Sequence, residues 1–110
     1  MKPMILLVSC LLLGQTQAAS FFRSGEDLGD LGAPLATQLH ADKQAFAMGY
    51  VAGTADATSG VTWCPGGAVT EDRIYFAVGR FMRTHPGSLK RNAATIVSEA
   101  LAADFPCGKK

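Results

Sequence analysis

Residues 89–107 read LKRNAATIVSEALAADFPC, and this stretch indicates the fold class more clearly than any other. Its apolar residues recur at intervals of three and four, which is the spacing of one face of a helix. A stripe of this kind is typical of a helix that packs one side against a core. The apolar positions are Leu89, Ala93, Ile96, Val97, Ala100 and Leu101. Proline cannot continue a helix, so the stretch predicts a core helix that ends before Pro106, with Cys107 directly after it.

The first 18 residues have the features of an export signal. Lys2 provides a positive charge, residues 4–13 form an apolar run, and Thr16-Gln17-Ala18 places small residues at a peptidase site. We expect cleavage after Ala18 and no membrane span, since the apolar run is too short to cross a bilayer. The alternative is a lipoprotein, because residues 7–10 resemble a lipid-attachment box. The apolar run continues past Cys10, however, which favours soluble export to the periplasm.

Cys64 and Cys107 are the two cysteines that remain once the leader and its Cys10 are removed. In a small exported domain, two cysteines indicate one structural disulfide. Closing a loop of about 44 residues stabilises a fold by roughly 4 kcal/mol in the chain-entropy treatment. Residues 19–110 are long enough to form a domain, and we expect them to form a single one.

The rest of the mature chain is also helical in pattern. Ser24 is a capping residue for a short first helix that ends at residues 32–34, and a second helix is expected over about residues 41–57. Residues 58–69 contain the turn residues of an irregular loop. Thr70 then caps a third helix, and Pro86 starts the next one. The apolar face of the third helix is expected at Ile74, Val78, Phe81 and Met82. The prediction is an all-α, disulfide-tied bundle of about four helices.

A stripe of small residues runs along the second predicted helix, at Ala45, Gly49, Gly53 and Ala57. Glycine inside a helix costs about 0.8–1 kcal/mol relative to alanine. Two such glycines on one face predict the close approach of another helix, so we expect this stripe to be a packing surface.

Two features could bind a partner. Trp63, beside a disulfide, could present a rigid aromatic anchor, or it could pack over its own bridge. The flank formed by Arg73, Arg80 and Arg83 could attract an acidic surface, or it could be an ordinary solvated face.

The charge along the chain is unevenly distributed: acidic residues predominate over residues 19–72 and basic residues from residue 73 onward. That asymmetry could orient a partner, or it could reflect acids near helix starts and bases near helix ends.

Chemistry of its own is not expected from this chain. Cys64, His40, His85 and Asp56 are the residue types of a thiol hydrolase. A Cys64 bonded to Cys107, however, has no nucleophile to offer. The histidines and acids show no metal-ligand spacing. We expect no enzyme activity, no cofactor, no metal and no nucleic-acid partner.

An ordered set of short motifs resembles a known family. Residues 44–53, QAFAMGYVAG, precede Ala55-Asp56-Ala57, and Cys64-Pro65, His85-Pro86 and Phe105-Pro106-Cys107 follow in order. Over residues 22–107 this resembles the type VI secretion amidase immunity (Tai/Rap) family. The resemblance implies a periplasmic helical protein of Gram-negative bacteria that binds and neutralises an injected cell-wall amidase. It leaves room for a homodimer and implies no catalysis. The alternative is a small exported envelope protein, with an interaction or structural role and no toxin partner.

Overall fold

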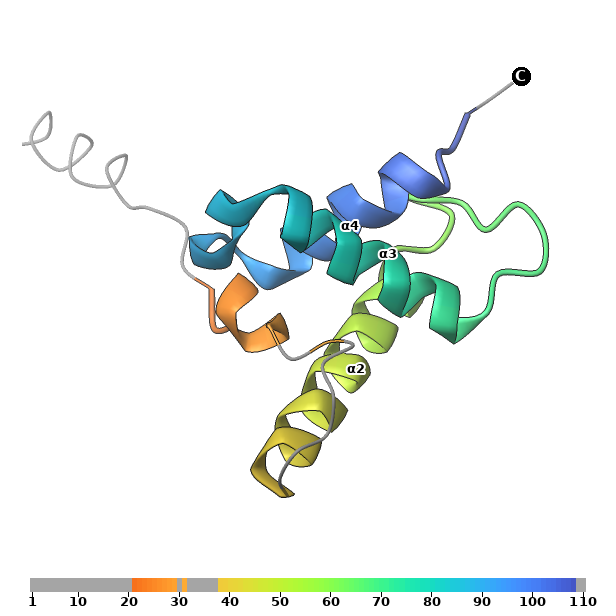
Figure 1. The fold of residues 1–110 in the computed structure, drawn as a ribbon. Coiled ribbons are helices and arrows are strands. Elements are labelled where there is room, and N and C mark those ends of the chain that lie inside the picture. Colours follow the sequence, from red (N-terminus) through yellow and green to blue (C-terminus); the bar gives the residue numbers. More distant parts are fainter. Residues whose placement is uncertain (1–20, 30, 32–37, 109–110) are drawn as a thin grey trace, which may run out of the picture.

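The computed structural model describes residues 21–29, 31 and 38–108 (Figure 1). The predicted signal peptide therefore lies outside the described residues, as does the expected end of the first helix at residues 32–34. The described part is helical. Its elements in chain order are the 3-10 helix η1 (Gly25–Leu28), the helices α2 (Gln38–Thr58) and α3 (Glu71–Thr84), the 3-10 helix η2 (Pro86–Lys90) and the helix α4 (Ala93–Asp104).

Helix α4 supplies the centre of the core. It packs against both α2 and α3, and five of its apolar residues are buried: Ala93, Ile96, Val97, Ala100 and Leu101. These are the stripe positions expected from the sequence, with the exception of Leu89, which is 40% exposed. The helix starts later than predicted because Asn92 caps it, its Oδ1 accepting a 2.8 Å hydrogen bond from the Ala94 N–H. Pro86 starts the separate 3-10 helix η2 instead.

Helix α3 begins where the sequence predicts. The Thr70 hydroxyl accepts a hydrogen bond from the Arg73 N–H at 3.3 Å, and Glu71 and Asp72 occupy the first turn. Acidic side chains are favourable there because the helix dipole is positive at that end. Ile74 and Val78 are buried against the rest of the core. The cap and the core-facing side of this helix are thus confirmed.

The expectation of about four helices is met only in part, because the described residues contain three α-helices and two 3-10 turns. The predicted first helix is the single turn η1. Ser24 does cap it, accepting from the Glu26 N–H, while the Ser24 N–H donates to Asp27. Backbone hydrogen bonds from Gly25 N–H to Arg91 and from Ala93 N–H to Arg23 then fix this segment beside the start of α4. The first of these bonds satisfies the Gly25 N–H, a first-turn donor for which a helix supplies no partner of its own.

The prediction that the small-residue stripe of α2 is a packing surface is wrong for this chain. Ala45, Gly49, Gly53 and Ala57 are all exposed. Among the described residues, a Cβ atom added at Gly49 or Gly53 would meet no atom within 4 Å. The helix instead buries the neighbouring face that carries Ala47, Val51 and Ala55. The bulk at that contact comes from Trp63 and α4, and nothing in the described structure explains the two glycines.

The predicted disulfide is confirmed. Cys64 and Cys107 are bonded, with their Cα atoms 4.9 Å apart, at a sequence separation of 43. The Cys64 N–H also donates a 2.9 Å hydrogen bond to the Phe105 carbonyl. The bridge and this bond hold the end of α4 against the segment that leaves α2.

Candidate partner-binding surface

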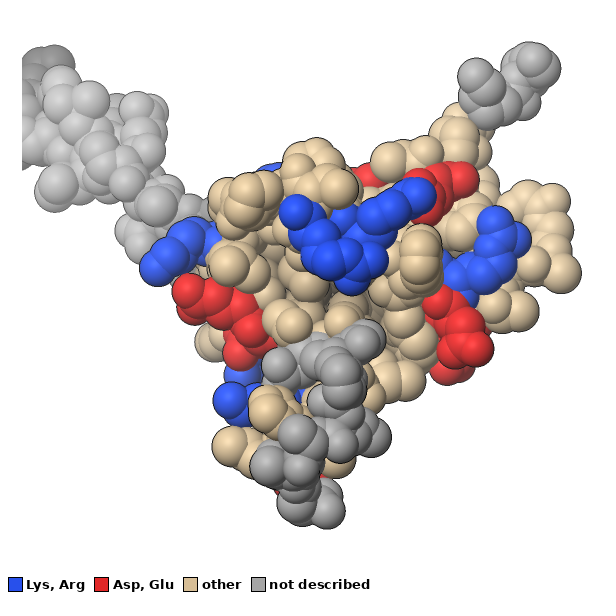
Figure 2. All heavy atoms as spheres, viewed as in Figure 1, with Lys and Arg blue, Asp and Glu red and all other residues tan. Residues whose placement is uncertain are grey.

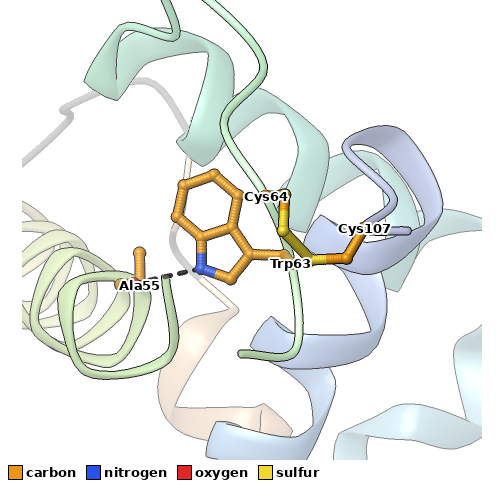
Figure 3. The surroundings of a disulfide bond; sticks show 4 residues. All are labelled: Ala55, Trp63, Cys64 and Cys107. Carbon is orange, nitrogen blue, oxygen red and sulfur yellow. Dashed lines mark hydrogen bonds between the residues drawn. A yellow bond between two sulfur atoms is a disulfide. The ribbon is translucent and has the colours of Figure 1, made fainter. Parts of the chain in front are cut away.

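Trp63 is a core residue and does not present a binding anchor. It is only 4% exposed, and its Nε1–H donates a 3.0 Å hydrogen bond to the Ala55 carbonyl of α2 (Figure 3). Its ring lies edge-on to Phe105, with the ring centroids 5.9 Å apart. The indole fills the space between α2 and the disulfide, so the expectation of an exposed aromatic is corrected in favour of the alternative, in which Trp63 packs inside its own domain.

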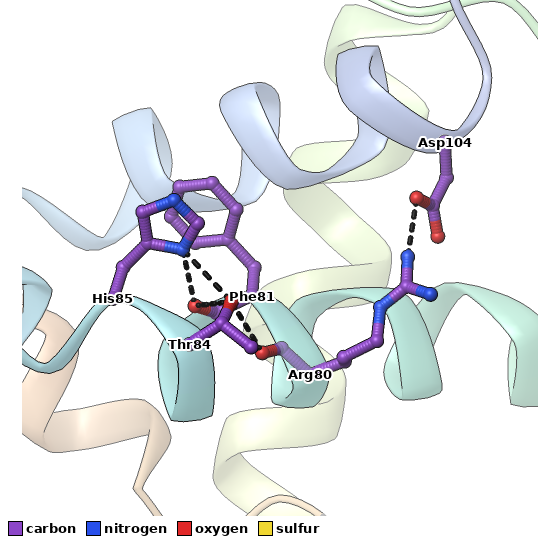
Figure 4. A network of polar contacts seen from close by, with 5 residues as sticks. All are labelled: Arg80, Phe81, Thr84, His85 and Asp104. Atoms are coloured by element: carbon purple, nitrogen blue, oxygen red, sulfur yellow. Dashed lines mark hydrogen bonds and ion pairs between the residues drawn. The ribbon is translucent and has the colours of Figure 1, made fainter.

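The three arginines of α3 are exposed, and each has a definite place. The Arg80 guanidinium pairs with the Asp104 carboxylate at the end of α4 (Figure 4) and lies 5.8 Å from the centroid of the Phe76 ring. The Arg73 guanidinium lies 5.3 Å from the centroid of the Phe105 ring. Both positions lie within the range of cation–π attraction.

Arg83 continues the same face of α3 toward its C-terminal end. Its guanidinium nitrogen lies 3.3 Å from where a Cβ atom of Gly79 would stand, so the glycine leaves room for it. A view of this side shows Lys and Arg atoms gathered over α3, with Asp and Glu atoms beside them (Figure 2).

Phe76 lies on this face and was missed by the sequence reasoning. Its side chain is 62% exposed. The apolar face expected for α3 contains Ile74 and Val78, and a residue two positions from each lies off that face. The available signal was the spacing to the arginines, since residues 73, 76, 80 and 83 follow one another at intervals of three and four.

Two hollows meet at Phe76. One, of about 440 Å³, is also lined by Asp72, Arg73, Arg80, Asp104 and Phe105. The other, of about 410 Å³, is lined by Tyr75, Gly79 and Arg83 and shares both Asp72 and Phe76 with the first. Phe76 therefore contributes to both hollows.

A third hollow, of about 260 Å³, lies between the end of α2 and the start of α3. Trp63 and Ile74 line it, and Asp56, Glu71 and Tyr75 add polar groups. Burial raises the pKa of the Tyr75 phenol, and the hydrogen bond that its O–H donates to Glu71 at 2.9 Å acts in the same direction. This hydrogen bond is an ordinary contact within one helix, between residues four apart.

The residues of the thiol-hydrolase alternative do not provide a nucleophile. The sulfur of Cys64 is bonded to Cys107. The His85 ring stacks on Phe81, and its Nδ1 lies 2.8 Å from the Phe81 carbonyl oxygen (Figure 4). A carbonyl only accepts, so Nδ1 carries the proton there. His85 thus has a local role at the end of α3.

Residues 21–29, 31 and 38–108 contain neither a metal-binding cluster nor a membrane-spanning helix. In those residues, no three or more His, Cys, Asp and Glu side chains gather closely enough to hold a metal ion. None of the helices there is both long and apolar enough to cross a bilayer.

A small helical domain tied by one disulfide, with arginines held on one face, has the character of a binding protein. The comparison with protein families agrees. The family of Rap1a immunity proteins matches residues 24–107, and the chain belongs to this family. No curated protein matches the sequence. The family match confirms the resemblance seen in the motifs, and immunity proteins of this kind are inhibitors of toxins rather than enzymes.

Proposed function

We propose that this protein is a periplasmic immunity protein that binds and inhibits a peptidoglycan amidase delivered by type VI secretion. Membership of the Rap1a immunity family over residues 24–107 carries the proposal, because it covers nearly all of the chain that follows the leader. The Cys64 thiol is bonded in the disulfide and the His85 ring has a local role at the end of α3, which supports inhibition by binding rather than by chemistry.

The leader and the disulfide together support the proposed location. Residues 1–18 have the features of a cleaved export signal, and a Cys64–Cys107 bridge is stable in an oxidising compartment. An amidase that cuts the cell wall acts in that same compartment. An inhibitor that meets the toxin there is therefore in the right place to protect the cell.

Protection of living cells tests this proposal. The full chain and a version that starts at Ala19 are expressed separately in cells whose periplasm receives any peptidoglycan amidase found to be encoded by a gene next to this one, called here the neighbouring amidase. We expect the full chain to prevent lysis and the leaderless version to fail. Lysis with both, at equal protein levels, would contradict the proposal and favour the alternative of an envelope protein with no toxin partner.

We include in the proposal a homodimer, which the family resemblance leaves open. Light scattering of the purified mature chain measures its mass directly. A mass of two chains at micromolar concentration supports the dimer, and a mass of one chain at that concentration removes it from the proposal without affecting the immunity role.

A further inference from the structure

Phe76 is an exposed phenylalanine that lines two hollows, of about 440 and 410 Å³. Single exposed apolar residues are normal on a protein surface. Arg73 and Arg80 line the first of these hollows with Phe76, and Arg83 lines the second. We call the group formed by Arg73, Phe76, Arg80 and Arg83 the Phe76 surface. A partner that fills both hollows would cover the exposed ring, and buried aromatic residues of this kind are among the strongest interface residues.

Two arginines of the Phe76 surface, Arg73 and Arg80, are held before any partner arrives. Asp104 pairs with Arg80, and the Phe105 ring lies beneath the Arg73 guanidinium. Ordering a long side chain on binding costs free energy, and a side chain that is already placed avoids part of that cost. Arginine and aromatic residues are also enriched at the centres of protein interfaces. The surface therefore has the residue composition of a docking site, and two of its side chains are already positioned.

The charges define the chemistry of the partner. Three arginines line the two hollows that Phe76 shares, while the two nearby carboxylates, Asp72 and Asp104, offset part of their charge. The planar guanidinium group matches a carboxylate with two parallel hydrogen bonds. A matching partner surface would carry carboxylates around an apolar recess that receives the Phe76 ring.

We propose that the Phe76 surface is the docking site for such an acidic surface on the amidase toxin, and that the disulfide-held segment 104–107 positions its arginines. This inference rests on the proposed function. Asp104 and Phe105 directly precede Pro106 and Cys107, whose bridge to Cys64 fixes the segment. The bond from Cys64 N–H to the Phe105 carbonyl and the packing of Phe105 on Trp63 fix it further. Asp104 and Phe105 act through the arginines and are positioning residues.

The first experiment measures the affinity of the purified mature chain for the neighbouring amidase by calorimetry. Phe76→Ala should weaken binding at least about tenfold, since it removes the central side chain. Arg80→Ala should weaken binding several-fold and reduce the dependence of the affinity on salt.

Val61→Ala is the matched control for Phe76→Ala, because Val61 is also an exposed apolar residue, 76% exposed in the loop after α2. Arg91→Ala is the control for Arg80, because Arg91 forms a comparable exposed ion pair with Glu99. Both controls should bind like the unchanged chain.

The second experiment tests the positioning residues. Phe105→Leu removes the ring beneath Arg73, while Phe105→Tyr keeps it. We expect the leucine variant to bind several-fold more weakly, with a shallower salt dependence, and the tyrosine variant to restore both. Asp104→Asn should likewise weaken binding several-fold, although Asp104 is exposed and its loss leaves the core intact. Each variant is compared at a temperature where circular dichroism shows that it is folded.

The outcomes separate this inference from the proposed function. An unchanged chain that binds the amidase tightly, with Phe76→Ala and Arg80→Ala binding equally tightly, would overturn the docking site but leave the immunity role intact. Full affinity in Phe105→Leu and Asp104→Asn would overturn the positioning role. An unchanged chain that does not bind the amidase at all would remove the proposed function and this inference together.

Discussion

The Trp63 indole N–H donates a 3.0 Å hydrogen bond to the carbonyl oxygen of Ala55, eight residues earlier in the chain (Figure 3). This contact joins the end of α2 to the residue next to the disulfide. With Phe105 on its other side, the indole connects all three of α2, the bridge and the end of α4. The loop between α2 and α3 is therefore anchored to the core at Trp63.

We expect Trp63→Phe to lower the free energy of unfolding by about 1–3 kcal/mol. The variant keeps an aromatic ring but loses the buried N–H donor and leaves its acceptor without that bond. Urea denaturation followed by circular dichroism measures the change. Phe76→Ala is the control, because an exposed position should alter stability by less than about 0.5 kcal/mol. Equal stability of Trp63→Phe and the unchanged chain would show that the hydrogen bond contributes nothing.

The disulfide should contribute a large share of the stability. For a separation of 43 residues the chain-entropy treatment gives about 4 kcal/mol. We expect Cys107→Ser to lower the free energy of unfolding by an amount of this order. Thiol titration of the folded native protein provides an independent check: Cys64 and Cys107 should not react until a reductant is added. Two freely reactive thiols in the folded protein would refute the bridge.

Two glycines should respond in opposite ways to alanine. At Gly25 the added Cβ would lie 2.5 Å from the Ser88 carbonyl oxygen, so the backbone must move. We expect Gly25→Ala to cost about 1–3 kcal/mol, as overpacking does. At Gly53 the space is open, and Gly53→Ala should stabilise the helix by about 0.5–1 kcal/mol. Thermal unfolding of both variants tests the pair. A large loss of stability in Gly53→Ala would show that the exposed stripe is in contact with something after all.

Arg91 and Glu99 provide a prediction about pH. The hydrogen bond from the Arg91 guanidinium lowers the pKa of the Glu99 carboxyl. A lowered folded-state pKa stabilises the fold above the unfolded pKa, and that contribution disappears as the pH falls through the folded value. The effect on stability should be small because both side chains are exposed. Carboxyl chemical shifts in an NMR titration should show the Glu99 pKa rising in Arg91→Ala, and an unchanged pKa would mean that the pair does not form in solution.

The sequence predicted best those elements whose ends and apolar faces are both marked. Thr70 and the acids after it mark the start of α3, and the stripe from Ala93 to Leu101 marks the buried side of α4. For α3 a hydrogen-bonding cap and a periodic apolar face indicate the same arrangement. For α4 the apolar face was predicted correctly, but its start was not, because the Asn92 cap was not recognised. The disulfide was predictable because only two cysteines follow the predicted leader.

The burial of α2 was not predictable in the same way. Its apolar residues are mostly small and surround the helix, so no side is clearly more apolar than the others. Which face of α2 is buried depends on the position of Trp63. The Trp63 side chain contacts α2 through a tertiary hydrogen bond to Ala55, eight residues earlier in the chain. The same contact explains why Trp63 could not be assigned to the surface or the core from its neighbours in sequence. Phe76 could not be assigned to a site because only the fold brings Asp104 and Phe105 beside it.

Titration of the neighbouring amidase with the purified mature chain tests the central claim most directly. The measured quantity is the release of new amino groups from purified peptidoglycan, at a fixed amidase concentration and rising concentrations of this protein. An inhibitor that binds the toxin should abolish release once about one chain per amidase has been added. Undiminished release at a large molar excess of the folded, disulfide-bonded protein would contradict the claim.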